Sequence, residues 1–296
     1  MEATGSRIVK YADRSAVFSI YDIADIHWGN RGVAKDHLTA DIARIETDPY
    51  AMFFIGGDYI DFVFPSDPRF DPESIDENIK VVDLSRLSAL LASSLIRLFA
   101  PVKGKCLGVA MGNHEKRVLT GRSEMFVHEE ICKHLGAPNM RYSGWTDIYF
   151  VHDRKVKTGC TISRSDYPPA MYEARLRVFL HHGMGAANTA GGKINKLKAL
   201  VDMVDADLVM MGHVHEQFSK PFVRLLPDES CSTIGSKVTM GLITGSYLRT
   251  YAPGFTGYGE ERGFSPTTLG ATCARYSPAT RRLVVENAAD NVGRKG

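Results

Sequence analysis

The chain has 296 residues, of which 44% are hydrophobic, and this is enough for a substantial globular core. Its 36 basic and 34 acidic residues nearly cancel, giving a formal net charge of +2 at pH 7. A dedicated nucleic-acid binder normally shows a clear basic excess, so the charge balance speaks against that class.

The first half of the chain alternates predicted strands with predicted helices. Apolar runs favour strands at residues 16–24, 51–55 and 106–111. Helical spacing of apolar residues predicts helices over residues 33–46, 75–99 and 123–135. The intervening segment 61–74 contains three prolines and four acidic residues and is expected to be a loop. Ser123 is the expected cap of the third helix.

The second half is richer in predicted strands. These fall at residues 147–152, 158–163, 178–180, 208–211, 222–226, 238–244, 271–276 and 283–286. One helix is predicted over 193–204, after a glycine-rich loop at 185–192. Together the elements predict an α/β fold of the α+β sandwich type, with two packed mixed β-sheets flanked by helices.

Residue types that bind metals follow five of the predicted strands. They are Asp25 and His27, Asp58 and Asp61, Asn113 and His114, His181 and His182, and His213 and His215. Open α/β sheets place their sites at strand ends, so these side chains are expected to meet. Carboxylate, imidazole and amide ligands suit borderline divalent metals such as Mn, Fe, Ni or Zn. Two such metals side by side activate water for attack on a phosphate ester.

The spacing within the motifs supports a shared site. Asp25 and His27 are separated by one residue, so on an extended strand end both side chains point to the same side. Asp58 follows the pair Gly56-Gly57, which allows a tight turn. An isolated Asp-x-His tripeptide is a weak signal that surface residues often produce. The strength of the prediction lies in all five motifs together.

The ordered blocks D-x-H, G-D, G-N-H-[ED], H and G-H-x-H resemble the calcineurin-like metallophosphoesterase superfamily over residues 16–216. The resemblance implies a dinuclear metal site at the strand ends of a two-sheet sandwich. It implies that one metal takes Asp25, His27, Asp58 and His215. It implies that the other takes Asp58, Asn113, His213 and one histidine of the pair. For that histidine we favour His181, with His182 as the fallback.

The charges of this ligand set fit hydrolysis by a metal-bridging hydroxide. Two carboxylates face two divalent cations, which leaves a surplus of positive charge for the transition-state phosphate. Metal coordination lowers the pKa of bound water to as little as ~7, so hydroxide forms near neutral pH. We expect two divalent metal ions, manganese first, with iron, nickel or zinc as alternatives.

The resemblance also implies a proton donor. His114 would face the leaving group as general acid, and Asp61 matches the second aspartate of the GDxxD pattern in related phosphoprotein phosphatases. A nearby carboxylate favours the protonated imidazole that such a role needs. A turn cap is the simpler alternative for Asp61. Phe62 stands where those phosphatases carry arginine, which makes a protein phosphatase a weaker hypothesis.

The substrate is less clear from sequence. The loops 61–74 and 247–265 are candidates for substrate contacts, and Arg117, Arg249 and Arg262 are candidate phosphate-binding residues. A helix-start arginine and a packed hairpin loop are the alternatives for these features. The loops and the GGDYID motif also resemble uncharacterised phosphoesterases of phages and prophages, with much lower specificity than the metal motifs.

We therefore expect a phosphodiesterase or phosphatase that acts on nucleotide-like or other small phosphoesters. Because the motifs run from residue 25 to residue 215, residues 1–296 are expected to form a single domain. A DNA nuclease of the same superfamily is the alternative enzyme, although the charge does not indicate nucleic acid. A catalytically inactive scaffold subunit with this fold is the alternative of another class. The oligomeric state is open.

The cysteine pattern and the distribution of apolar residues predict the cellular compartment of the protein. Five scattered cysteines without a Cys-x-x-Cys pair favour a reducing compartment. We expect no signal peptide, because no apolar run precedes Ala16. The apolar stretch 84–100 is broken by arginine and serine, so no membrane span is expected. These features predict a cytoplasmic protein.

Overall fold

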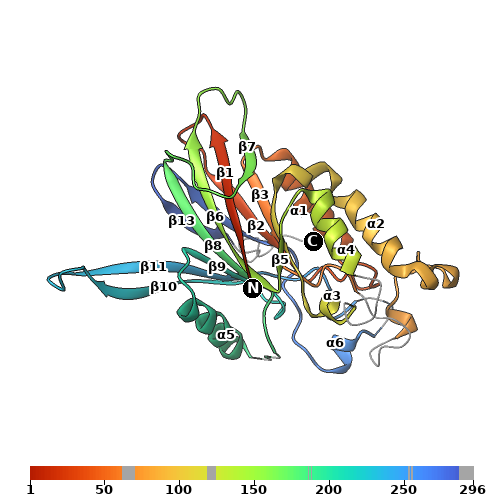
Figure 1. Ribbon diagram of the computed structural model, residues 1–296. Helices are drawn as coiled ribbons and strands as arrows, with labels where there is room; N and C mark the ends of the chain where they lie inside the picture. Colours follow the sequence, from red (N-terminus) through yellow and green to blue (C-terminus); the bar gives the residue numbers. More distant parts are fainter. Residues whose placement is uncertain are drawn as a thin grey trace.

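Two mixed β-sheets pack face to face, and helices cover both outer faces (Figure 1). The computed structural model describes residues 1–61, 71–118, 125–185, 187, 189–252, 254 and 256–286. This arrangement confirms the predicted fold class.

The first sheet has seven strands in the order β10-β11-β9-β8-β6-β1-β7. The bounds are β1 Glu2–Tyr11, β6 Ser143–His152, β7 Cys160–Ser165, β8 Ala174–His181, β9 Leu208–Met211, β10 Phe218–Pro227 and β11 Ile234–Ile243. Strand β1 pairs in parallel with β6 and antiparallel with β7. No strand was predicted there, because β1 includes polar residues that the fold buries. One is Arg7, whose guanidinium donates to the carbonyl of Leu107 at 2.9 and 3.1 Å.

The second sheet has six strands in the order β13-β12-β2-β3-β4-β5. The bounds are β2 Phe18–Ile23, β3 Ala51–Ile55, β4 Cys106–Ala110, β5 Asn139–Arg141, β12 Thr272–Ser277 and β13 Arg282–Glu286. Side-chain alternation along β3 divides two cores. Met52 and Phe54 face the core between the sheets, whereas Phe53 and Ile55 face the covering helices. A strand apolar on both faces is therefore buried on both sides.

Four longer helices form the outer layers (Figure 1). Helices α1 Lys35–Thr47, α2 Leu87–Phe99 and α4 Met125–Leu135 pack on the six-stranded sheet. Helix α5 Ala190–Met203 packs on the seven-stranded sheet. The shorter elements are α3 Asn113–Val118, α6 Tyr258–Glu261 and the 3₁₀ turns η1 Pro72–Ser74, η2 Val81–Arg86 and η3 Ala100–Lys105.

The long helix predicted over 75–99 is wrong in its first half. Regular α-helix begins at Leu87, and a 3₁₀ turn precedes it. Asp76 Oδ1 accepts from the Asn78 backbone N–H at 3.0 Å, and Asp83 Oδ2 accepts from that of Lys80 at 3.3 Å. Such local bonds compete with helical ones. Helix α5 begins at residue 190 rather than 193, and the predicted cap Ser123 lies outside the described residues.

Strand direction explains why the five motifs can meet. Strands β2, β3 and β4 run parallel, and so do β8 and β9. The carboxyl ends within each group therefore lie at one edge of their sheet, and every metal motif follows one of these ends. No helix within the described ranges combines the length and apolar character needed to cross a membrane.

The core between the sheets should dominate stability. Phe54 is fully buried there, so Phe54→Ala should lower the free energy of unfolding by about 3–5 kcal/mol. Val82 is 72% exposed, and Val82→Ala should change it by less than about 0.5 kcal/mol. Urea denaturation followed by circular dichroism measures both. Equal losses of unfolding free energy in the two variants would contradict the importance of the core between the sheets.

Candidate metal centre

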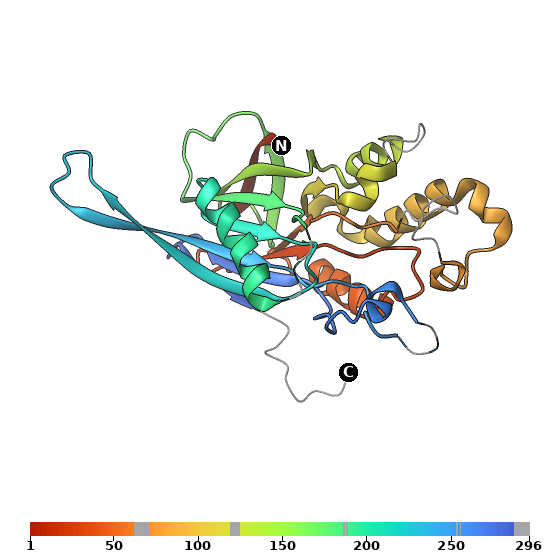
Figure 2. The same cartoon turned by 90° about the horizontal axis from the view of Figure 1, so that it is seen from below.

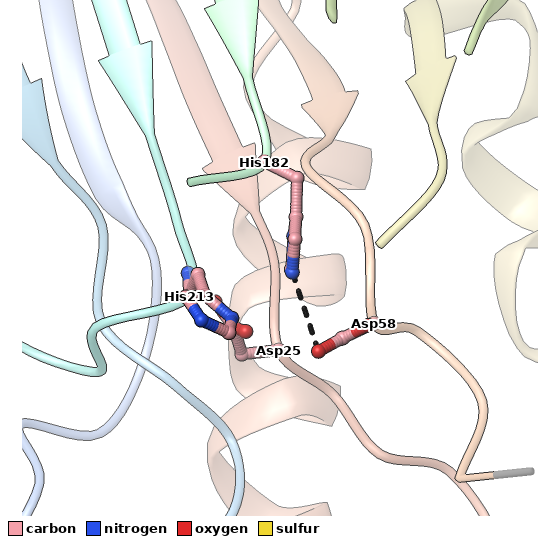
Figure 3. A group of neighbouring side chains, drawn as sticks. All are labelled: Asp25, Asp58, His182 and His213. Atoms are coloured by element: carbon pink, nitrogen blue, oxygen red, sulfur yellow. Dashed lines mark hydrogen bonds and ion pairs between the residues drawn. The ribbon is translucent and has the colours of Figure 1, made fainter. Parts of the chain in front are cut away.

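Four side chains from four different loops point toward one another at the strand ends (Figure 3). Asp25 follows β2, Asp58 follows β3, His182 follows β8 and His213 follows β9. One candidate ligand atom from each lies within 4.8 Å of those from the others. His182 Nε2 is 3.3 Å from Asp58 Oδ2. Two carboxylates and two imidazoles at such spacing form a candidate site for a divalent cation.

Two further groups overlap with this one. Asp25, His27 and His215 form one group within the same distance, with His215 Nε2 3.3 Å from Asp25 Oδ1. His27, Asp58 and His114 form the other. The structure thus places His215 beside Asp25 and His27, and His213 beside Asp25 and Asp58.

Asn113 joins the cluster through its side-chain amide. Its Oδ1 is 3.3 Å from His182 Nε2. All six predicted ligands other than the histidine of the 181–182 pair are therefore near one another. They are Asp25, His27, Asp58, Asn113, His213 and His215.

The preference for His181 over His182 is corrected by the geometry. His181 is still paired in β8, and its ring lies near Phe179 on the α5 side of the sheet. Its Nδ1 accepts from the Gly183 backbone N–H at 2.8 Å, and burial lowers its pKa to about 4. His182, one residue further, is the histidine that faces Asp58 and Asn113.

A hydrogen bond sets the tautomer of His182. Its Nδ1 lies 2.9 Å from the carbonyl oxygen of Gly56. A carbonyl can only accept, so Nδ1 is the donor, and Nε2 is the ring nitrogen that faces the cluster and could bind a metal. A second partner of this kind is the usual way in which proteins orient a metal-binding histidine.

The backbone at the candidate ligands is not extended, as the sequence pattern had suggested. Asp25, His27, Asp58, His213 and His215 all have positive φ angles, between 47° and 70°. The left-handed region is unfavourable for residues with a Cβ, and such conformations concentrate at functional sites. The expectation that alternation along an extended strand aims both members of each pair is therefore wrong. The left-handed backbone conformation at each of these residues sets the direction of its side chain instead.

Glycines permit the close approach of these loops. A Cβ on Gly112 would overlap Asp58 Oδ1. Gly57 has φ of +98°, and a Cβ there would come within 2.6 Å of His182 Nδ1. The glycines of the G-D and G-N motifs are thus required by packing around the ligands.

Buried carboxylates join the motif loops. Glu115 accepts backbone N–H groups of Asp58 and Gly112 through Oε2, at 3.0 and 2.7 Å, and of Ile60 through Oε1 at 3.1 Å. Burial and the charge of Asp58 raise the pKa of Glu115 to about 7. The sequence had assigned Glu115 no role. Its place directly after the G-N-H triplet was the available signal.

His114 and Asp61 lie beside the cluster and contact each other. The His114 Nδ1 atom is 2.9 Å from Asp61 Oδ1, and both side chains are at most 10% exposed. Burial would raise the pKa of Asp61, but the contacts with His114 and His27 outweigh it and hold this pKa well below its usual range. Asn30, which the sequence did not single out, donates from Nδ2 to Asp61 Oδ2 at 2.7 Å. Phe62 lies outside the described residues.

The donor set fits divalent metal ions. Within the described ranges, His27 Nε2 is buried without a hydrogen-bond partner while the ring sits among carboxylates. A buried imidazole nitrogen normally has a partner, and a metal ion would supply one. Mixed carboxylate, imidazole and amide ligands are those expected for borderline metals.

The candidate phosphate-binding arginines are less well placed. Arg249 bonds to the Asp36 carboxylate at 2.9 Å and to the Val33 carbonyl at 3.3 Å, so its guanidinium is held at the start of α1. Arg262 is exposed on the surface. The side chain of Arg117, most of the loop 61–74 and parts of the loop 247–265 lie outside the described residues.

Comparison with protein families shows to which family the chain with this site belongs. The model of the calcineurin-like phosphoesterases matches residues 18–217, which contain every candidate ligand. The chain belongs to this family. It is a metal-dependent phosphoester hydrolase, and the Asp/His cluster is its candidate metal site.

Solved structures show weaker likeness to this phosphoesterase. Vps29 from Entamoeba histolytica, in complex with zinc, is 12% identical with a TM-score of 0.34, covering 92% of this chain and 98% of the other. A metallophosphoesterase from Sphaerobacter thermophilus is 14% identical with a TM-score of 0.31, covering 92% and 88%. Likeness at this level assigns no function. No curated protein matches the sequence.

The two adjacent histidines of the phosphoesterase provide a matched test of the ligand set. His182→Ala should weaken binding of one Mn²⁺ by at least about 10-fold, because a ligand is lost. His181→Ala should leave Mn²⁺ affinity within about twofold. Isothermal titration calorimetry on metal-stripped protein measures both. Loss of affinity in His181→Ala with none in His182→Ala would restore the original preference.

Proposed function

We propose that this phosphoesterase holds two divalent metals and hydrolyses small phosphoesters, in the first place nucleotide-like phosphodiesters. The observation that carries the proposal is the buried His114–Asp61 pair at the edge of the Asp/His cluster. A metal cluster alone fits storage or structure as well. A cluster with a partnered imidazole beside it fits hydrolysis, which needs a proton for the leaving group.

The ligands divide between the two metals as the sequence implied, with His182 in the disputed position. Asp25, His27, Asp58 and His215 would hold one metal, and Asp58, Asn113, His182 and His213 the other. When bound, such metals supply a water of lowered pKa and stabilise negative charge on the phosphoryl group. Manganese, with iron, nickel or zinc as alternatives, and a cytoplasmic location remain predictions from sequence, as does a single domain.

In this proposal His114 donates a proton to the leaving group. Its Nδ1 faces Asp61, so Nε2 is the atom that can give a proton to the departing oxygen. As water adds OH to phosphorus and releases its other proton to solvent, the P–O bond to the leaving group breaks and that oxygen takes the proton from Nε2. The ring then regains a proton from solvent. The Asp61 carboxylate stabilises the positive charge on the ring before transfer, and Asn30 holds the carboxylate in place.

Charge favours small esters over long nucleic acids. The chain carries a net charge of only +2, whereas binding along a DNA backbone relies on clusters of lysine and arginine. A DNA nuclease stays the alternative enzyme, and an inactive scaffold the alternative of another class.

A panel of substrates tests the proposed function. With Mn²⁺, the chain should hydrolyse bis-nitrophenyl phosphate and nucleotide diesters, and chelation should abolish the activity. Nitrophenyl phosphate, single-stranded DNA and duplex DNA are run in parallel by absorbance and gel assays. No turnover on any substrate with Mn, Ni or Zn would support the scaffold alternative. Faster cleavage of DNA would support a nuclease.

Proton donation by His114 has its own signature. His114→Ala should reduce kcat about 10²–10⁴-fold on an alkyl phosphodiester but less than about 10-fold on bis-nitrophenyl phosphate, whose leaving group needs no proton. Asp61→Asn should move the basic limb of the kcat/KM profile to lower pH, because His114 loses its stabilising carboxylate and gives up its proton sooner. An equal loss on both esters in His114→Ala would assign that residue another role.

A further inference from the structure

The β10–β11 hairpin extends far beyond the rest of the molecule (Figures 1 and 2). Strands β10 and β11 pair over ten residues each. The next strand, β9, pairs with β11 only along residues 240–243. The distal part, residues 222–227 and 234–239, is therefore a two-stranded ribbon beside which no third strand of the described residues pairs. We refer to it as the distal ribbon.

One face of the distal ribbon is apolar and exposed. Val223, Leu225, Ile234 and Val238 share this face, because Val223 pairs with Val238 and alternate residues point the same way. They are 61%, 73%, 76% and 53% exposed. None of the residues at these alternating positions is charged. Contiguous exposed apolar surface of this kind marks interaction sites.

The opposite face of the ribbon is anchored to the molecule. Arg224 donates to the carbonyls of Val201 and Val204 at the end of α5, at 2.9 and 3.0 Å. Lys237 forms an ion pair with Asp205. These contacts hold the ribbon in its extended position, so the apolar face is a fixed surface.

The apolar face continues the core between the two sheets. Closer to the body, Met240 and Leu242 occupy the same face and pack in that core. The second sheet ends before the ribbon does, and a cleft of about 590 Å³ lies at the boundary. Val238, Met240, Tyr276 and Leu283 form the apolar part of this cleft, and the charged residues Arg175, Asp207 and Arg281 also line it. The apolar face of the distal ribbon thus extends beyond the part of the fold that packs on the same face at Met240 and Leu242.

We propose that a second copy of this chain covers the face, with two ribbons packed face to face about a two-fold axis. A face without charge is complementary to itself, and a two-fold interface uses the same patch on both copies. Face packing is favoured over edge pairing, because Pro221 and Pro227 interrupt the backbone donors of the edge strand β10.

The length of the distal ribbon allows the tip of each copy to reach the cleft of the other copy. Six residues at about 3.3 Å each make the distal ribbon roughly 20 Å long. In an antiparallel arrangement the tip of one copy, with Ile234, reaches the cleft of the other, beside Tyr276. The four apolar side chains expose on the order of 400 Å² per copy. This is below the roughly 800 Å² per partner of a standard interface, so the dimer should dissociate in the micromolar range.

The proposed interface is far from the metal centre and independent of the proposed function. The candidate ligands follow the carboxyl ends of β8 and β9, whereas the ribbon extends beyond the start of β9 at Leu208. Association should leave hydrolysis per subunit unchanged.

Sedimentation velocity of the full chain between 2 and 200 µM tests the dimer. The wild type should shift from monomer to dimer, with a dissociation constant in the micromolar range. Leu225→Asp and Ile234→Asp should each weaken association at least about 10-fold. Leu226→Asp is the matched control, because Leu226 is 46% exposed on the opposite face of the same ribbon. It should stay within about twofold of the wild type.

Thermal unfolding by circular dichroism checks that all variants fold, independently of any activity. A wild type that remains monomeric at 200 µM overturns the proposal. So does a dimer that resists both substitutions on the apolar face, or one that Leu226→Asp weakens equally. Association into species larger than a dimer also overturns it, because a two-fold interface closes.

Discussion

Carboxylates that accept backbone N–H groups from neighbouring loops hold the whole site together. Glu115 accepts from Asp58, Ile60 and Gly112, Asp58 accepts from His114, and Asp25 accepts from His213. Apart from the bond between Gly112 and Glu115, which lies within the segment after β4, each bond links loops that follow different strands. The same atoms that give the site its negative charge therefore also fix the distances between its motifs. A change in one loop is transmitted to the others through charge-assisted bonds, which are stronger than neutral ones.

Much of the site could be predicted from sequence, because ligand type and order are local features. The choice between His181 and His182 could not, since it depends on where the β8 ladder ends. Glu115 and Asn30 act through other residues, and neither shows a pattern of its own. Strand β1 was missed because its buried residues include Arg7 and Thr4, whose partners come from distant parts of the chain.

The hairpin shows a related limit of sequence patterns. The apolar alternation of β10 and β11 is typical of a strand with one buried face. Whether that face is covered depends on how far the opposing six-stranded sheet extends. The same alternation therefore gives a core at Leu242 and an exposed surface at Val238. Only the position of the opposing sheet in the folded structure distinguishes the buried residue from the exposed one.

The left-handed backbone of five candidate ligands has a consequence for how metals are exchanged. Each such residue costs roughly 1 kcal/mol relative to a relaxed conformation, and the surrounding bonds of the fold hold it there. The ligand backbone is therefore shaped by the protein rather than by the ion. If these residues hold metals as proposed, the ions would bind to loops whose positions other hydrogen bonds of the fold already fix, so binding would need little reordering.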